Sequence, residues 1–344
     1  MQVKLWGVRG SLPTPMDGDE YRAKLVTALD HAKEQLLNSS DVDLDQIINS
    51  MHPAQKSIIG GETTCVEVRH DETQLILDLG TGARKLGYDI TRRGQTGDFH
   101  VLLTHTHWDH IQGWLEFLPA HNPENTVHFY SCLENLEERF ARQQHPEHAE
   151  STFAAMPCNR TFQYVPPGDT FQLGPYSITT QPLIHPGGSI AYKIEADGKT
   201  FVFATDTEFY GPEIHERMKE YHRFFNGAEL LVMDAQYSLE EAEQRKGWGH
   251  TAMTIAVDCS IYWQIKELVL THHEPAHNDE TIWRLFEEAS EYLMEFATPN
   301  RQLQIYTARI GRRIRVSQIQ QILNAQSHIT GLPRRRRLNQ NSFK

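Results

Sequence analysis

The sequence predicts an α/β fold in which two packed sheets carry helices on their outer faces. Short segments rich in Val, Ile and Leu alternate with longer segments of helical spacing, which is typical of strands followed by helices. This alternation occurs in two successive series, one from residue 62 and one from residue 161. The 344 residues can form two domains, or one large domain with an insertion. We predict one α/β domain over residues 1–316.

The first series begins with a strand at 3–6 and a loop rich in Gly and Pro. Residues 16–57 have helical spacing and return to the Gly60-Gly61 turn, so we expect an inserted helical hairpin, which we interpret as a cap. The next elements are expected to be strands at 64–69, 74–79, 99–104 and 127–130, with helices at 81–87 and from 108.

The second series is expected to continue the same alternation, with strands at 161–165, 176–184, 190–195, 200–205, 229–234, 267–271, 303–307 and 312–316, and helices at 213–225, 251–264 and 279–296. Residues 317–344 include the basic run Arg334–Arg337 and are expected to form a weakly packed tail. A solvated tail and an RNA-binding arm are both consistent with this run.

The composition limits the partners and the compartment. The 33 Lys and Arg residues against 45 Asp and Glu residues give a formal charge of −12, which disfavours nucleic acid as a partner without excluding it. No apolar run is long enough for a membrane helix, and the first residues lack the apolar core of a signal peptide, so we expect a cytoplasmic protein. The four cysteines are far apart and form no CxxC pair, which favours free thiols.

The strongest motif follows the apolar strand Val101–Leu103 and reads Thr-His-Thr-His-Trp-Asp-His over residues 104–110. Alternate side chains of an extended segment point the same way, so His105, His107 and Asp109 can face one pocket. His110 can reach that pocket as the chain turns into a helix. Three imidazoles and one carboxylate within six residues indicate a metal site.

This H-x-H-x-D-H motif resembles that of the metallo-β-lactamase superfamily, whose fold is a four-layer αββα sandwich. The resemblance covers residues 1–316 apart from the insertion, and it implies further ligands at the ends of apolar strands. It implies two divalent ions per chain, one held by His105, His107 and His185 and the other by Asp109, His110 and His272, with Asp206 bridging. Zn²⁺ suits these ligands best, and Mn²⁺ or Fe also fits the second site.

Two neighbours of these ligands are assigned by the same resemblance. Asp78 matches the superfamily's supporting carboxylate and is expected to orient a ligand imidazole, although a structural carboxylate capping its turn is also possible. The adjacent histidines His272 and His273 leave the last ligand ambiguous. The alignment favours His272, which leaves His273 as a substrate contact or a support for the ligands.

Within the superfamily the chain is most similar to the ribonuclease Z-like phosphodiesterases, because Gly-Trp-Gly-His-Thr-Ala-Met at residues 247–253 precedes a predicted helix. The resemblance implies attack by a hydroxide bridging the metals, with His250 as general acid or phosphate anchor. The alternative is that His250 caps its own helix, next to Thr251 as a candidate cap. Asp234, at a strand end, is expected to orient His250, and Asp109 is counted with these catalytic residues.

Two loops resemble those near the metals in this branch, at residues 8–11 and 60–64. Glu62 and Thr63 lie in a G-G-E-T sequence where the branch usually has G-G-N-T, so we expect Glu62 to alter substrate choice. Arg9 is expected either to neutralise a phosphate or to pair with a buried acid.

Residues 114–167 contain no glycine, so the Gly- and Lys-rich arm that holds tRNA in tRNA-processing relatives is expected to be absent. Together with the negative charge, this favours a small phosphodiester such as a cyclic nucleotide as the substrate. The alternatives are a hydrolase of a thioester, lactone or β-lactam, a ribonuclease Z-like RNA-processing nuclease, and a non-catalytic metal-containing ligand sensor. The resemblance also implies a homodimer, and the insertion is expected to act either as a lid or as its interface.

Overall fold

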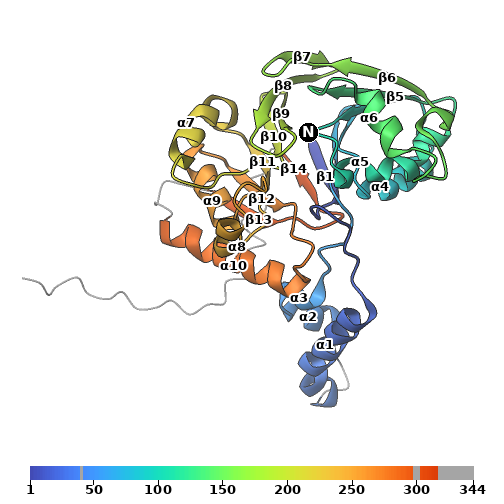
Figure 1. Ribbon diagram of the computed structural model, residues 1–344. Helices are drawn as coiled ribbons and strands as arrows, with labels where there is room; N and C mark the ends of the chain where they lie inside the picture. The colour runs from blue at the N-terminus through green and yellow to red at the C-terminus, as the bar shows by residue number, and fades with distance from the viewer. Residues whose placement is uncertain (39–41, 297–302, 317–344) are drawn as a thin grey trace, which may run out of the picture.

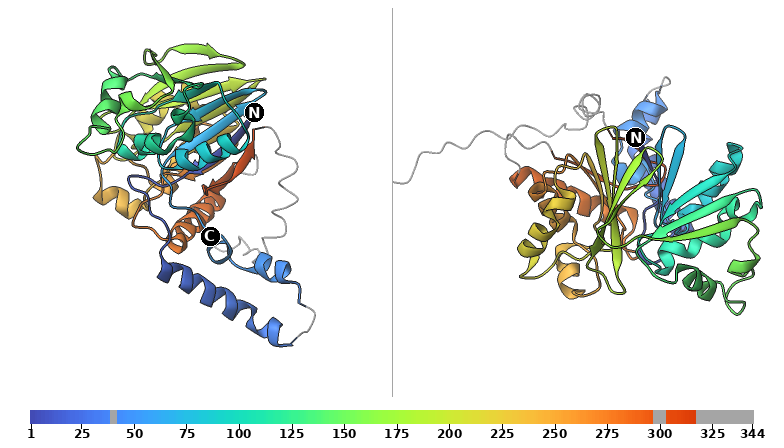
Figure 2. Two further views of the ribbon diagram at one scale, coloured as in Figure 1. Left: turned by 90° about the vertical axis from the view of Figure 1, so that its right-hand side faces the viewer. Right: turned by 90° about the horizontal axis from the view of Figure 1, so that it is seen from above.

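The computed structural model describes residues 1–38, 42–296 and 303–316, and these form two seven-stranded sheets that face each other (Figures 1 and 2). Helices cover the outer face of each sheet, so the layers are α, β, β and α, as predicted. The basic tail predicted at 317–344 lies outside the described residues. Within the described part of the chain, no helix is both long and apolar enough to cross a membrane.

The first sheet has the strand order β14-β1-β2-β3-β4-β5-β6. Its strands are β1 (Gln2–Gly7), β2 (Cys65–His70), β3 (Thr73–Leu77), β4 (Asp98–Leu102), β5 (Thr126–Ser131), β6 (Asn159–Tyr164) and β14 (Arg313–Arg315). Its outer face carries α4 (Gly82–Arg92), α5 (Trp108–Ile111) and α6 (Leu136–Gln143), with 3-10 turns at Gln112–Glu116, Leu118–His121 and Phe153–Ala155. A cluster of aromatic rings around the fully buried Trp114 fills the space beneath these helices.

The second sheet has the order β13-β12-β11-β10-β9-β8-β7. Its strands are β7 (Thr170–Leu173), β8 (Tyr176–Leu183), β9 (Ser189–Ala196), β10 (Lys199–Ala204), β11 (Leu230–Asp234), β12 (Glu267–Thr271) and β13 (Gln304–Thr307). Its outer helices are α7 (Ile214–Phe225), α8 (Leu239–Gln244), α9 (Met253–Tyr262) and α10 (Asp279–Phe296). Strands β10 to β13 are parallel, and β11 and β12 are buried along their whole length, as expected for strands covered on both faces.

The inner faces of the two sheets meet in one apolar core. Val3 and Leu77 from the first sheet belong to the same core as Ile194 and Leu231 from the second. Hydrogen bonds also cross between the sheets, among them one from the Tyr192 hydroxyl to the carbonyl of Leu103 at 2.7 Å. This bond reaches the chain just before the predicted metal motif, so the two sheets are joined next to the motif.

The predicted insertion is helical, with α1 (Gly18–Asn38), α2 (Leu44–Ser50) and α3 (Pro53–Lys56), and it projects away from the two sheets (Figures 1 and 2). Its own core consists of Ala32, Ile47 and Met51. Lys24 on α1 donates to Asp279 and His52 pairs with Glu287, each at 2.6 Å. The insertion is therefore attached to α10.

Most predicted elements are present, and the differences have local causes. The helix predicted at 81–87 continues to Arg92, because Leu86 and Ile90 extend its buried face. The strand predicted at 74–79 ends at Leu77, since Asp78 turns the backbone to a φ of +60°. Apart from 3-10 turns, three short elements of the described chain were not predicted, α6, β7 and α8, each of them eight residues or fewer.

Candidate metal centre

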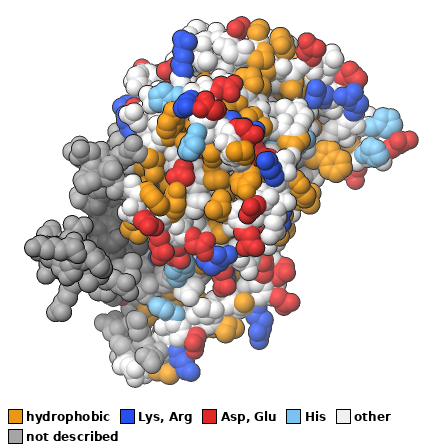
Figure 3. Space-filling view, turned by 60° about the vertical axis from the view of Figure 1, so that its left-hand side comes forward, with side chains coloured by type: hydrophobic (Ala, Val, Ile, Leu, Met, Phe, Trp, Pro, Cys, Tyr) orange, Lys and Arg blue, Asp and Glu red, His pale blue; other side chains and the backbone are white. Residues whose placement is uncertain are grey.

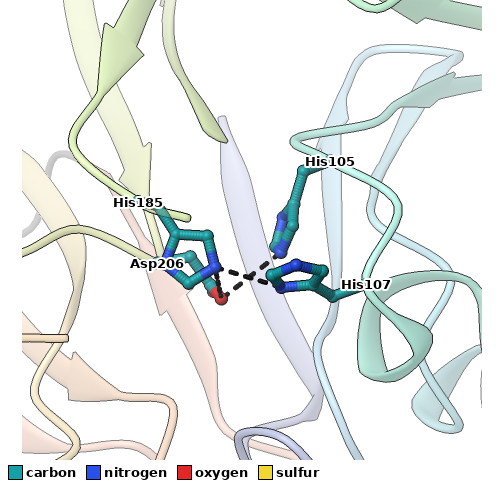
Figure 4. A group of neighbouring side chains, drawn as sticks. All are labelled: His105, His107, His185 and Asp206. Atoms are coloured by element: carbon teal, nitrogen blue, oxygen red, sulfur yellow. Dashed lines mark hydrogen bonds and ion pairs between the residues drawn. The ribbon is translucent and has the colours of Figure 1, made fainter. Parts of the chain in front are cut away.

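The predicted ligands come together at one edge of the sandwich, where strands from both sheets end. His105, His107, Asp109 and His110 follow β4, whereas His185, Asp206 and His272 follow β8, β10 and β12. We call this set the His/Asp cluster. Figure 4 shows four of its members, with His105 and His107 approaching from one side and His185 and Asp206 from the other. The cluster therefore bridges the two sheets.

The cluster divides into two groups that share Asp206. In the first, His185 Nε2 lies 3.1 Å from His107 Nδ1, and His105 Nε2 and His185 Nε2 each lie 3.4 Å from Asp206 Oδ2 (Figure 4). In the second, the Nε2 atoms of His110 and His272 are 3.3 Å apart. Each of these two atoms lies 3.1 Å from Asp206 Oδ1. The two oxygens of Asp206 thus face different groups.

Asp109 completes the second group. Its Oδ2 lies 3.1 Å from Nε2 of both His110 and His272. The same oxygen accepts a 2.8 Å hydrogen bond from the backbone N–H of Ser11. The group therefore presents two imidazole nitrogens and one carboxylate oxygen to a common point.

These distances fit divalent metal ions. Ligands bound at 2.0–2.1 Å to a tetrahedral ion lie about 3.4 Å from one another, close to the separations observed here. Two imidazole nitrogens that face each other need a shared cation or proton between their lone pairs. His105 Nε2 and Asp206 Oδ1 are buried and form no aligned hydrogen bond with any described residue, although ion-pair partners lie nearby. The donor set contains nitrogen and oxygen and no thiol, which suits Zn²⁺, Mn²⁺ or Fe.

The backbone is strained at three positions of this edge. Asp78, Asp206 and His272 have φ angles of +60°, +59° and +63°, each directly after a strand or one residue later. Residues other than glycine rarely adopt this left-handed conformation, and such strain is concentrated at functional sites. The turn at each strand end directs the Asp206 and His272 side chains into the cluster.

Buried hydrogen bonds fix the ligand rings on the side away from the cluster. Asp78 is fully buried, and its Oδ2 lies 2.8 Å from His110 Nδ1. Asp78 also accepts hydrogen bonds of 2.8 Å from the backbone N–H and the hydroxyl of Thr104. Because the carboxylate accepts the proton of Nδ1, His110 keeps its Nε2 lone pair directed at the cluster.

Two further rings are held in the same way. His272 Nδ1 lies 3.0 Å from Gln236 Oε1, and His185 Nδ1 lies 3.0 Å from the carbonyl of Gly249. Gly249 has a φ of +88°, and a Cβ atom there would lie 2.2 Å from His185 Nδ1. Only glycine therefore allows this carbonyl to approach the ring.

The charges within the cluster favour ionised carboxylates. Burial alone would raise the pKa of Asp206, but the neighbouring His272 and His110 hold it well below its ordinary value. The pKa of Asp109 is likewise lowered against burial, mainly by His110. Burial lowers the pKa of His105, and His110 adds to this effect. The same carboxylates raise the pKa of His110, and raise that of His272 to about 9, so a metal that bound these two rings would displace their protons.

His250 lies beside the cluster and forms a pair with Asp234. Its Nδ1 is 2.8 Å from Asp234 Oδ2, and its ring centroid is 5.2 Å from that of His185 and 5.0 Å from that of His272. Asp234 is fully buried and also accepts hydrogen bonds from the backbone N–H groups of Asp206 and Thr251. The Asp234 carboxylate thus positions both Asp206 and His250. The sequence analysis predicted that Asp234 orients His250.

The comparisons with known proteins agree with this geometry. The model of the β-lactamase superfamily domain matches residues 92–273, more than half of the chain. The chain belongs to the metallo-β-lactamase superfamily. No curated protein sequence matches it.

Solved structures of the superfamily share the fold at low sequence identity. YhfI from Bacillus subtilis, a metallo-β-lactamase fold protein, is 17% identical with a TM-score of 0.59, covering 91% of this chain and 98% of YhfI. The short form of human tRNase Z is 14% identical with a TM-score of 0.57, covering 92% and 99%. A diphosphatase from the PhnP family is 17% identical with a TM-score of 0.56, covering 91% and 97%.

Several residues proposed from the superfamily resemblance face away from the cluster. Arg9 is almost completely buried, donates to the carbonyls of Gly60, Glu274 and His277, and lies 3.6 Å from Asp279. Of the two roles considered for Arg9, the structure therefore supports pairing with a buried acid.

Glu62 and Thr63 likewise support the loop and do not face the cluster. Glu62 pairs with Arg84 at 2.9 Å and Lys85 at 3.2 Å, so the expectation that it alters substrate choice is not supported. Thr63 exchanges hydrogen bonds with Thr81 at the start of α4. Both residues anchor α4 to the loop that precedes β2.

His272 and His273 have opposite orientations. His272 contributes Nε2 to the cluster, whereas His273 Nε2 lies 3.1 Å from the carbonyl of Ala308 in the interior. Burial lowers the pKa of His273 to about 3, and the charge of Arg9 contributes. The geometry thus agrees with His272 as the ligand candidate, and His273 lies too deep for substrate contact.

The alternative that His250 caps a helix is not what the structure shows. Helix α9 begins at Met253, two residues later than predicted, and Ala252 occupies the N-cap position without a side-chain bond. Thr251, the candidate cap, donates to the carbonyl of Thr207 at 2.6 Å. Both His250 and Thr251 therefore lie in the loop before the helix.

Sequence reasoning missed two supporting residues, Glu208 and Gln236. Glu208 accepts hydrogen bonds from the backbone N–H groups of Gly247 and Gly249, at 2.9 to 3.0 Å, and so holds the loop that carries His250. Gln236 holds His272. Both lie two residues after a recognised aspartate at a strand end, and that position was the available signal.

Proposed function

We propose that the chain is a dinuclear metal-dependent phosphodiesterase that acts on a small phosphodiester such as a cyclic nucleotide. His105, His107 and His185 would hold one ion and Asp109, His110 and His272 the other, with Asp206 contacting both; Zn²⁺ is the proposed metal, and Mn²⁺ or Fe also suits the ligands. When bound, two such ions supply positive charge that ionises water near neutral pH and neutralises a phosphate.

The observation that carries this proposal is the Asp234–His250 pair beside the cluster. Asp234 accepts from Nδ1 of His250 at 2.8 Å, which leaves Nε2 as the atom that can hold or release a proton. A phosphodiester releases an alkoxide, which needs a proton as it departs. His250 Nε2 can supply that proton or hydrogen-bond a phosphate oxygen, while Asp234 stabilises the charged ring.

A small substrate is supported by the shape of the chain and by its charge. The glycine-free segment 114–167 includes strands β5 and β6 of the first sheet and helix α6, which packs on that sheet. An arm that holds tRNA would instead extend away from the sheet. The formal charge is −12, and on the face in Figure 3 basic side chains are scattered among acidic ones without a continuous basic patch. A long polyanion would be repelled by such a surface.

We also propose that the insertion serves a homodimer and is not a lid. Its contacts described above are with α10, and α1 exposes apolar side chains, including Leu25, Leu29 and Leu37, which are 44%, 64% and 75% exposed. A second copy would cover these side chains. Sedimentation should give a dimer for the wild type and a monomer for Leu29→Glu. A monomeric wild type would contradict this proposal.

The proposed activity is tested with matched substrates. Purified protein loaded with Zn²⁺ is assayed on bis(p-nitrophenyl) phosphate, on 3′,5′-cyclic nucleotides and on a panel of thioesters and lactones. We expect hydrolysis of the phosphodiesters. In His250→Ala, kcat should fall about 100-fold or more on the 3′,5′-cyclic nucleotides, which release an alkoxide, and less on bis(p-nitrophenyl) phosphate, whose p-nitrophenolate departs without a proton. His222→Ala, on the outer helix α7, is the control variant and should retain the activity. Hydrolysis of only the thioesters or lactones would refute the phosphodiesterase assignment.

A further inference from the structure

A pocket of about 580 Å³ lies between the helical segment that follows His107 and helix α6. Its lining includes Thr106 and Trp108, the two residues that flank His107 in the metal motif. His107 is itself the solvent-exposed member of its group, so the cluster opens to solvent next to this pocket. We call this hollow the Trp108 pocket. No residue of the His/Asp cluster lines this pocket, so a substrate that occupied both would have to run past the exposed side chain of His107.

Trp108 has an unusual environment for a tryptophan. Its side chain is 70% exposed, although a residue of this size and apolarity is normally covered. It stands at the first turn of α5, so its backbone is fixed by the same helix that positions Asp109 and His110. An exposed aromatic ring on such a fixed backbone offers a face on which a flat ligand can stack.

The other side of the pocket is formed by α6 and the segment after it, with Arg139, Gln143 and His148. Arg139 Nη1 donates to Thr106 Oγ1 at 3.1 Å, which places its charge next to the metal motif. Within the described residues Arg139 has no carboxylate partner, whereas the neighbouring Arg142 is paired with Glu138 at 3.0 Å. The pocket therefore contains one cation whose charge is not neutralised.

The ligand chemistry follows from these groups. Trp108 offers a stacking surface, the amides of Gln112 and Gln143 can donate to and accept from polar ring edges, and Arg139 suits an anionic or ribose oxygen. We propose that the Trp108 pocket binds the nucleoside part of the substrate, with its base against Trp108. This role in catalysis rests on the phosphodiesterase proposed above, whereas binding of a nucleoside monophosphate to the pocket can be measured without any turnover.

The binding test compares adenosine 5′-monophosphate with ribose 5-phosphate by calorimetry on the Zn²⁺-loaded full chain. Both probes carry the same phosphate, so their difference reports the base. We expect adenosine 5′-monophosphate to bind about fivefold or more tightly, as base stacking on an aromatic ring provides. Trp108→Ala should remove this preference. Tyr88→Ala is the control, because Tyr88 is an exposed aromatic residue on α4 outside the pocket, and it should keep the preference.

A second measurement separates the pocket from the proposed activity. The ratio of kcat/KM for thymidine 5′-(p-nitrophenyl phosphate) to that for methyl p-nitrophenyl phosphate should fall about fivefold or more in Trp108→Ala. Equal affinities for the two probes, or a preference that survives in Trp108→Ala, would overturn the nucleoside pocket even if the phosphodiesterase assay succeeds. If the phosphodiesterase assay fails but adenosine 5′-monophosphate still binds more tightly than ribose 5-phosphate in a Trp108-dependent way, the proposed activity is refuted and the nucleoside pocket remains supported.

Discussion

The support of His110 by Asp78 leads to a quantitative prediction for Asp78→Asn. The carboxylate lies 2.8 Å from His110 Nδ1 and accepts two hydrogen bonds from Thr104. An asparagine keeps the shape, and it tolerates the left-handed backbone at this position, where φ is +60°. Its amide NH₂ would face His110 Nδ1, however, so that ring would carry its proton on Nε2, the atom that faces the cluster.

The cost of this change should appear in metal affinity. Loss of a carboxylate that supports a ligand histidine typically weakens binding 10- to 100-fold, which corresponds to about 1.4–2.7 kcal/mol. Competition with a chromophoric chelator measures the affinity, and circular dichroism verifies the fold. Asp258→Asn is the control, because Asp258 on α9 accepts a bond from Tyr292 outside the cluster. An affinity for Asp78→Asn within twofold of the wild type would refute the supporting role.

Three further predictions concern activity and stability. Glu208→Ala should lower kcat about tenfold or more with unchanged metal content, because the loop before His250 loses three hydrogen bonds. Glu208→Gln should restore part of the lost activity. Full activity of Glu208→Ala would contradict the positioning role of Glu208. Burial raises the pKa of Glu267, and one of its carboxylate oxygens has no hydrogen-bond partner in the described part of the chain, so its charge costs stability above its unfolded pKa. In thermal unfolding, Glu267→Gln should therefore be about 1 kcal/mol more stable than the wild type at pH 8, and the difference should shrink towards pH 4. A difference that did not change with pH would exclude the buried charge of Glu267 as its cause. Chelation of the metals should lower Tm by about 5 °C or more, because the ions bind only the folded chain, and an unchanged Tm would indicate that the cluster holds no tightly bound metal.

The sequence predicted which side chains meet in the His/Asp cluster, because the superfamily it resembles has its later ligands at strand ends. Each of His185, Asp206 and His272 follows an apolar run, and parallel strands bring their carboxyl ends to one edge. The H-x-H-x-D-H spacing added the four remaining side chains. The orientation of neighbouring side chains was not predictable in the same way. His272 and His273 are identical residues next to each other, and only their side-chain directions distinguish them.

Loop side chains were the least predictable part of the site. Arg9 and Glu62 lie in loops that resemble those near the metals, yet each pairs with a charge distant in sequence, Asp279 for Arg9 and Arg84 for Glu62. Such pairings depend on how α10 and α4 pack, which local sequence does not encode. The Trp108 pocket depends likewise on where α6, a helix of eight residues, packs on the first sheet, which local sequence does not encode.

The central claim is that the His/Asp cluster holds two divalent ions in each chain. Metal content per chain, measured by mass spectrometry on protein purified without chelator, tests it most directly, with an Asp206→Ala variant measured beside the wild type. The geometry predicts two ions per wild-type chain and loss of bound metal in Asp206→Ala, since both groups share this carboxylate. Fewer than one ion per wild-type chain under saturating Zn²⁺ would contradict the dinuclear centre and the function proposed from it.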